Sequence, residues 1–270
     1  MRSLLLSGAA MAAALLAPWA LGAGGHAPKS TTSPSSSPSD NSLPTGPGAL
    51  RQIVQNQCVL DWKQHQNPAP CVRVTLFDAN TSDSGYAVLQ DPEGGAHYLL
   101  VPTQTMAGLE SSELLDRDAP NYFAEAWHAR DLLAKFVGHA VPRTDIGLVV
   151  NTERARQYDQ FHIHIACLRQ DVAESLRAAA PHIEDVWSPV SVGGATFQAM
   201  RIASDSLDGS NLYESLADMK PGTSQRLRDY TLIVVGAQFA SGPGFIILTG
   251  TGPSGEILLD STCEAAGGGG

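Results

Sequence analysis

Two histidines separated by one residue lie inside an apolar run near the middle of the chain, in the stretch QFHIHIACL at residues 160–168. Its β-branched residues favour a strand, and side chains along a strand alternate between the two faces. His162 and His164 therefore share one face, while Ile163 and Ile165 share the other, which we predict to face the core. Residues two apart on a strand lie about 6.5 to 7 Å apart. Both imidazoles are therefore expected to reach one phosphate-sized group.

Three interpretations of this histidine pair compete. In the first, the rings are polar residues on an exposed face of a sheet. In the second, they bind a metal ion, which requires a third ligand, and Asp159 and His128 are the candidates. In the third, one neutral imidazole attacks phosphorus and the other stabilises charge or protonates the leaving oxygen. Cys167 is not the expected nucleophile, because it points to the core side and is a candidate for a disulfide.

The elements upstream of the pair follow from local sequence signals. The stretch GYAVLQDPEGGAHYLLVP, residues 85–102, predicts two strands joined by a turn at residues 91–95. A helix is predicted to begin at residues 118–121 and to end at Gly138, with Phe123 and Trp127 on its apolar stripe. This is the longest helix that we expect.

The elements around and after the pair indicate the fold class. DIGLVVN, residues 145–151, predicts a strand joined to the histidine strand by a polar loop that is too short for a parallel crossover. The other expected elements are helices near residues 171–179 and 211–219 and strands near residues 196–203, 229–238 and 244–250. We therefore expect an α+β fold with an antiparallel sheet and flanking helices. The similar element order of the two halves suggests a degenerate internal duplication.

Composition and the N-terminus limit the class of protein. The chain has 270 residues, 43% of them hydrophobic, and a net charge of -10, which argues against a general affinity for nucleic acid. Residues 1–23 hold one positive charge and then an apolar run, which predicts either a secretory signal or an uncleaved membrane anchor. Residues 24–48 are rich in Ser, Pro and Gly and predict a disordered linker. We expect the folded domain at 49–264 and a flexible tail at 265–270.

Four cysteines in an exported chain favour disulfides and allow three pairings. Cys58 and Cys71 flank a short polar segment, which indicates a local link between them. That pairing leaves Cys167 for Cys263.

Several stretches of the sequence together resemble a known family. QFHIHIA fits the histidine-triad pattern, in which His alternates with apolar residues, except that Gln160 stands in place of the first His. The likeness extends to the bacterial CDP-diacylglycerol pyrophosphatases, a branch of the histidine-triad superfamily. The stretches that carry it are NQCVLDWKQHQNPAPC, GYAVLQD, YLLVPTQTMAGLESSELLD, PNYFAEAWHARDLL, VNTERARQYDQFHIHIACLR and DSTCE. They span nearly the whole expected domain.

This resemblance implies a hydrolase that cleaves CDP-diacylglycerol to CMP and phosphatidate with a HIT-like fold. His162 would attack the α-phosphorus, His164 would contact the phosphate oxygens, and Asn151 would contact the nucleotide. Gln160 departs from the family pattern, because an amide donates and accepts hydrogen bonds but cannot carry a proton away. Among nearby arginines, Arg156 is the best placed to neutralise the pyrophosphate. No metal or other cofactor is expected, because imidazole serves as both nucleophile and leaving group.

The lipid substrate and the N-terminus together place the expected enzyme at a membrane surface. We expect it at the inner membrane with its domain on the periplasmic side, or secreted to the periplasm. Two other functions remain open from the sequence. One is a non-catalytic protein that binds a nucleotide or a phospholipid headgroup, and the other is a metal-dependent phosphoesterase.

Overall fold

The computed structural model of the chain describes residues 44–78, 84–252, 254–264 and 266. The predicted signal or anchor at residues 1–23, and the linker as far as residue 43, lie outside the described residues. Within the described part, no helix is both long and apolar enough to cross a bilayer. The first helix of the described part begins at Ala49.

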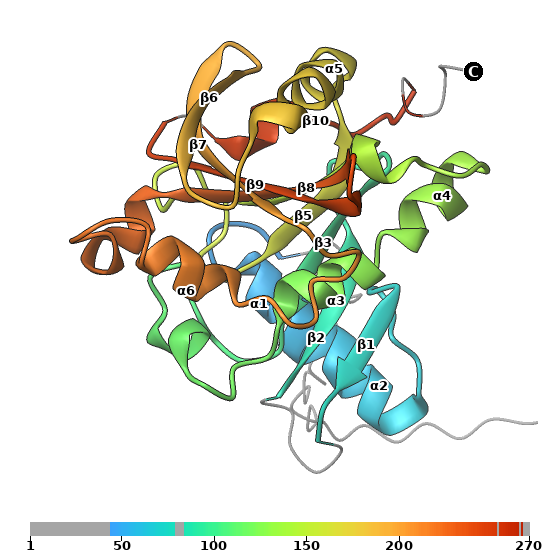
Figure 1. The fold of residues 1–270 in the computed structure, drawn as a ribbon. Coiled ribbons are helices and arrows are strands. Elements are labelled where there is room, and N and C mark those ends of the chain that lie inside the picture. The colour runs from blue at the N-terminus through green and yellow to red at the C-terminus, as the bar shows by residue number, and fades with distance from the viewer. Residues whose placement is uncertain (1–43, 79–83, 253, 265, 267–270) are drawn as a thin grey trace, which may run out of the picture. The chain divides into compact units, whose positions relative to one another are not determined.

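The described residues form an α+β fold with one ten-stranded sheet in which every pair of strands is antiparallel (Figure 1), as predicted. The strands are β1 (Arg73–Leu76), β2 (Gly85–Gln90), β3 (His97–Pro102), β4 (Ile146–Val150), β5 (Ile163–Leu168), β6 (Ser188–Val192), β7 (Ala195–Ile202), β8 (Thr231–Phe239), β9 (Gly242–Gly250) and β10 (Leu259–Asp260). The α-helices are α1 (Ala49–Ile53), α2 (Val59–His65), α3 (Tyr122–His128), α4 (Asp131–Val137), α5 (Gln170–Ala179) and α6 (Leu212–Ala217). A π-helix, η1 (Val54–Cys58), joins α1 to α2, and the 3-10 helices are η2 (Ser112–Leu115), η3 (Arg143–Asp145), η4 (Ala180–His182), η5 (Ser224–Asp229) and η6 (Gly255–Leu258).

The two halves of the chain repeat one strand order. The sheet runs β1-β2-β3-β5-β4-β8-β9-β7-β6, and β10 pairs with β5. In the first half, hairpin β2–β3, helices α3 and α4, and the pair β4–β5 give the order β2-β3-β5-β4. In the second half, hairpin β6–β7, helix α6 and hairpin β8–β9 give the order β6-β7-β9-β8. The halves meet where β4 pairs with β8. This is the topology expected of an internal duplication.

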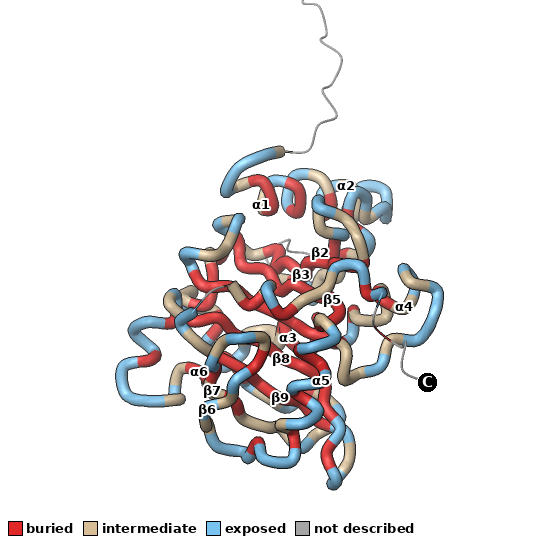
Figure 2. Tube along the Cα trace, turned by 90° about the horizontal axis from the view of Figure 1, so that it is seen from above, coloured by how far each residue is buried: buried red, intermediate tan, exposed pale blue. Residues whose placement is uncertain are grey.

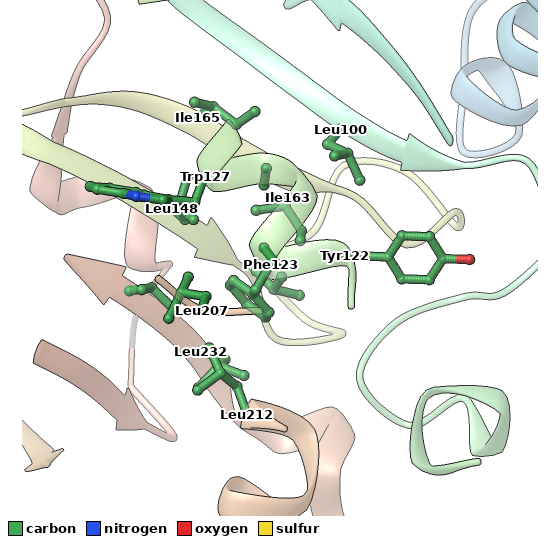
Figure 3. Packing of buried hydrophobic residues seen from close by; sticks show 14 of the residues in the cluster. Leu100, Tyr122, Phe123, Trp127, Leu148, Ile163, Ile165, Leu207, Leu212 and Leu232 are labelled. Atoms are coloured by element: carbon green, nitrogen blue, oxygen red, sulfur yellow. The ribbon is translucent and has the colours of Figure 1, made fainter. Parts of the chain in front are cut away.

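Both faces of the sheet are covered, so the central strands are buried throughout (Figure 2). On one face, Phe123 and Trp127 of α3 pack against Ile163 and Ile165 of β5 (Figure 3). On the other face, α1, η1 and α2 cover β1 to β3, while α5 covers β4, β8, β9 and β7. The predicted core face of the histidine strand is therefore confirmed. The opposite face, however, is not exposed to solvent.

The prediction of one long helix that ends at Gly138 is wrong in one respect, because the structure divides this segment into α3 and α4. Its expected ends are present: the Asn121 side chain caps α3 by accepting from the Ala124 amide, and Gly138 ends α4 with φ 79°. Between the helices, the Arg130 guanidinium donates to the Trp127 carbonyl and stacks over the Trp127 ring, 4.5 Å from its centroid. These contacts occupy the carbonyl that a continuous helix would use. Among the described residues, the longest α-helix is α5, with 10 residues.

Both expected disulfides are present. Cys58 is linked to Cys71, and α2 fills half of the intervening segment that we read as a loop. Cys167 on β5 is linked to Cys263, which follows β10. The second disulfide therefore ties the C-terminal end of the described chain to the histidine strand.

Candidate active site

Three histidines gather on the face of the sheet that carries the predicted pair. His162 and His164 come from β5 and the residues just before it, and His97 begins β3. Leu99 of β3 lies opposite His164, and His97 lies opposite Ala166, so His97 is the diagonal neighbour of His164. The ring centroids of His162 and His164 are 4.8 Å apart, and those of His97 and His164 are 5.1 Å apart. All three are 7% exposed or less, which rules out the interpretation as exposed polar residues.

A backbone hydrogen bond fixes the tautomer of His162. Its Nδ1 lies 2.6 Å from the carbonyl oxygen of Gln160. Because a carbonyl only accepts, Nδ1 carries the proton and Nε2 keeps its lone pair. No described residue hydrogen-bonds that Nε2. Burial lowers the pKa of His162, so the ring is neutral at neutral pH. These are the properties required of an imidazole nucleophile.

His164 stands between a second histidine and a carboxylate. Its Nδ1 is 2.9 Å from Nε2 of His97, and its Nε2 is 3.3 Å from Oε1 of Glu256. Because a carboxylate accepts, we assign the His164 proton to Nε2, which leaves Nδ1 to accept from His97. Burial lowers the pKa of His164 well below its ordinary value, and the neighbouring His162 and His97 lower it further. A neutral His164 therefore presents one N–H toward Glu256.

Asn151 ties the last segment of the domain to these histidines. It follows β4, and its Oδ1 accepts from Ser254 Oγ at 2.8 Å and from the Gly255 amide at 3.1 Å. Its Nδ2 donates to Glu256 and lies 3.4 Å from Nε2 of His164. A Cβ on Gly255 would lie 2.7 Å from a Val149 methyl, so glycine allows η6 to lie directly on β4. The second half of the duplication thus delivers Glu256 to the site in the first half.

Gln160 occupies a structural position beside the site. Its amide nitrogen donates to the carbonyls of Pro102 at 3.2 Å and Gln104 at 2.8 Å, while its buried Oε1 has no partner among the described residues. The side chain therefore holds the chain after β3 against the histidine strand. Support for His162 comes from the Gln160 backbone carbonyl, which any residue at this position supplies. A direct contact of Gln160 with substrate remains a prediction.

Arg156 is held by carboxylates close to the site. Its side chain is 8% exposed, and its guanidinium lies 2.5 Å from Glu110 and 3.4 Å from Asp159. Burial is the main cause of the lowered pKa of His162, and the charge of Arg156 also lowers this pKa. Arg169, another of the nearby arginines, forms a fork with Asp171 instead. Binding of the pyrophosphate by Arg156 remains a prediction.

Neither of the metal ligands suggested by the sequence joins the histidine pair. Asp159 pairs with Arg156, and His128 lies 3.4 Å from Asp208. Among the described residues, the group whose ligand atoms approach within 4.8 Å of one another is Asp91, His97 and His164.

The distance between the His97 and His164 nitrogens fits a hydrogen bond between them better than a zinc ion that both would bind. Two imidazole nitrogens on a tetrahedral zinc ion stand about 3.3 Å apart, whereas those of His97 and His164 face each other at 2.9 Å. The third member, Asp91, lies 3.9 Å from the other nitrogen of His97. His97 and His164 therefore share a hydrogen bond as they stand, and Asp91 lies near His97 without one.

A hollow of about 290 Å³ opens beside the site. Tyr158 lines it and also meets His162 edge to face, with ring centroids 5.8 Å apart. Pro92, next to Asp91, and Leu50 and Ile53 of α1 supply apolar walls. The hollow can therefore take an uncharged part of a ligand whose phosphate reaches the histidines.

Sequence reasoning placed His162, His164 and Asn151 together correctly, and it missed His97 and Glu256. His97 was not among the residues predicted for the site, although its position in the predicted hairpin of residues 85–102 is a signal that could have found it. Glu256 stands in a short 3-10 helix after the last long strand, where no local pattern marks it.

Comparison with known proteins identifies the family of this chain. The sequence profile of the CDP-diacylglycerol pyrophosphatase family matches residues 45–267. A CDP-diacylglycerol pyrophosphatase of Yersinia pestis is 34% identical over 224 residues, which cover 80% of this chain and 84% of that protein. The residues matched by the family profile include the three histidines, Asn151 and Glu256. The chain therefore belongs to the CDP-diacylglycerol pyrophosphatase family, as its sequence motifs indicated.

Proposed function

We propose that this protein hydrolyses the pyrophosphate bond of CDP-diacylglycerol, releasing CMP and phosphatidate, through a covalent nucleotidyl intermediate on His162. Family membership supports the substrate. The observation that carries the mechanism is the buried His162 ring, whose Nδ1 proton is donated to the Gln160 carbonyl at 2.6 Å and whose Nε2 has no hydrogen-bond partner among the described residues.

In the first step, Nε2 of His162 attacks the phosphorus that bears cytidine. The N–P bond forms while the P–O bond to phosphatidate breaks, and its electron pair leaves with the bridging oxygen. Phosphatidate is a phosphate monoester, with a second pKa of about 6, so it leaves as an anion without receiving a proton. A first triad histidine acting as general acid is therefore unnecessary, which accounts for Gln160 at that position.

Charge on the phosphoryl oxygens needs hydrogen-bond donors that are already in place. The Nε2 proton of His164 and the amide of Asn151 lie beside Oε1 of Glu256. A phosphoryl oxygen that approaches beside this carboxylate oxygen shares these donors with it, because the Asn151 amide has a second N–H. The hollow beside Tyr158 then accepts an uncharged part of the substrate.

In the second step, water attacks the same phosphorus and the P–N bond breaks. The electron pair returns to Nε2 of His162, and CMP leaves. Imidazole is a good leaving group because the Nδ1 hydrogen bond keeps the departing ring neutral. The cycle needs no metal ion for either displacement.

The test is release of CMP and phosphatidate from CDP-diacylglycerol in detergent micelles with EDTA present, for the parent and for His162→Ala. We expect release by the parent and a loss of at least about 10³-fold in His162→Ala. Binding of substrate without product would instead support the headgroup-binding function. Loss of activity in EDTA that returns with a divalent metal would support a metal-dependent phosphoesterase.

We also propose that the enzyme works at the periplasmic side of the inner membrane, because its substrate is a lipid and residues 1–23 have the pattern of a signal or anchor. Fractionation of cells that express the full chain, followed by N-terminal sequencing, distinguishes an anchored from a cleaved protein. Recovery of the protein in the cytoplasm would contradict the proposal.

A further inference from the structure

Glu256 has no part in the two displacements described above, yet among the described residues it is the carboxylate that forms an ion-pair contact with His164. Its Oε1 lies 3.3 Å from Nε2 of His164, whose ring centroid is 4.8 Å from that of His162. It also accepts a hydrogen bond from Asn151. His164 therefore contacts this carboxylate on one side and the His162 ring, which carries the cytidylyl group, on the other.

We propose that Glu256 is the general base that activates the hydrolytic water in the second step. This inference rests on the proposed covalent intermediate. The carboxylate takes one proton from water as the water oxygen forms its bond to phosphorus, and the P–N bond to His162 breaks. The proton then passes from Glu256 to solvent, which regenerates the carboxylate and balances the cycle.

The surroundings of Glu256 suit a base that must meet water. Its side chain is 37% exposed, whereas the His164 side chain beside it is 6% exposed, so solvent reaches the carboxylate at the edge of the buried histidines. The Asn151 amide donates to one carboxylate oxygen, which leaves the other to bind water. Burial raises the pKa of the Glu256 carboxyl, which makes its carboxylate a stronger base.

The other carboxylate close to the histidines is less suited to this role. Asp91 lies 3.9 Å from Nδ1 of His97 and within 4.8 Å of a His164 nitrogen, and its charge opposes the lowering of the His162 pKa. Its side chain, however, is only 10% exposed, whereas that of Glu256 is 37% exposed. Asp91 is therefore less open to the hydrolytic water than Glu256.

The decisive variant is Glu256→Gln, because glutamine preserves the shape and the acceptor for Asn151 but cannot take up a proton. Rapid-quench measurement with CDP-diacylglycerol should show a burst of phosphatidate equal to the enzyme concentration. Steady-state turnover should then be 10²- to 10⁴-fold slower than in the parent, the usual contribution of general base catalysis. Intact mass should show the enzyme carrying one cytidylyl group. Glu184→Gln, the same change at an exposed side chain, is the matched control and should keep the parent rate.

Two further readouts separate a base from a positioning residue. In Glu256→Ala, formate should restore the second step, because an external carboxylate can replace the missing base. In the parent, the rate of the second step should fall at low pH as Glu256 takes up a proton, whereas in Glu256→Gln it should not show that fall.

The outcomes distinguish this inference from the proposed function. If the parent releases no CMP, the proposed function fails. If the parent is active but Glu256→Gln turns over at the parent rate without a cytidylyl adduct, the inference alone is overturned. If Glu256→Gln loses the phosphatidate burst together with turnover, Glu256 acts before the intermediate forms, and the inference is again overturned.

Discussion

Replacing Asn151 by alanine should destabilise the protein measurably, because this side chain joins the two halves of the duplication at the site. The change removes the acceptor of the Ser254 hydroxyl and the Gly255 amide and the donor to Glu256. Gly255 is buried, and an unsatisfied buried N–H costs about 1–3 kcal/mol, while a hydrogen bond to a charged group contributes about 1.5–3 kcal/mol. Since water can replace part of these bonds, we expect the free energy of unfolding of Asn151→Ala to be about 2–4 kcal/mol lower than that of the parent.

Thermal unfolding followed by circular dichroism measures this loss. For a domain of this size, 1 kcal/mol corresponds to roughly 2–4 °C in Tm, so Asn151→Ala should unfold roughly 4–16 °C below the parent. Asn56→Ala makes the same change at an exposed position and should stay within about 0.5 kcal/mol of the parent. If the two variants had the same Tm, Asn151 would not hold η6 to β4 as we argue.

Three other predictions follow from buried groups. Burial lowers the pKa of His162 and His164 below 6.5, so below this pH the unfolded chain binds protons that the folded chain excludes. The free energy of unfolding should therefore be highest above about pH 6.5 and should fall as the pH drops toward the lowered pKa values. The fall should be about 1.4 kcal/mol per histidine for each pK unit. Urea midpoints across this range should therefore slope less steeply in His164→Asn than in the parent, and equal slopes would contradict the assignment. The Cys167–Cys263 disulfide closes a loop with a sequence separation of 96, so replacing both cysteines by alanine should cost up to about 4.7 kcal/mol in denaturant titration, and an unchanged midpoint would show that the link does not stabilise the fold. His97→Ala removes the donor to Nδ1 of His164 and should reduce kcat by roughly 5- to 150-fold, equivalent to about 1–3 kcal/mol; kcat equal to that of the parent would exclude a role for His97.

Strand faces, turns and helix ends that depend on neighbouring residues in the sequence were predictable. The alternation of QFHIHIACL determined which face each histidine occupies, and the residues at 91–95 marked the β2–β3 turn. The side-chain cap at Asn121 and the left-handed stop at Gly138 also follow from residue type alone. Each of these depends on neighbours within a few positions along the chain.

Features that depend on distant contacts were not predictable. His97 enters the site because β3 pairs with β5 in one register, and residue type does not reveal that register. Glu256 enters it through hydrogen bonds to Asn151, which is 105 positions away. The break between α3 and α4 arises because the Arg130 side chain binds the Trp127 carbonyl, a contact that competes with an otherwise favourable helical pattern.

Gln160 combines a feature that the local sequence determines with one that depends on distant contacts. The family pattern predicts a histidine there, and its absence raised doubt about proton transfer. The structure shows that the position supports His162 through its backbone carbonyl, while the side chain binds the carbonyls of Pro102 and Gln104. A side-chain replacement at this position therefore leaves the tautomer of His162 unchanged.

The central claim is that cytidylate becomes bonded to His162. The most direct measurement is a rapid quench of the parent with CDP-diacylglycerol into alkaline denaturant, which preserves the N–P bond, followed by peptide mapping by mass spectrometry. The account predicts one cytidylyl group on the peptide that contains residues 160–168, localised to His162, and no adduct in His162→Ala. An adduct on His164 or on another residue, or turnover by His162→Ala at the parent rate, would contradict it.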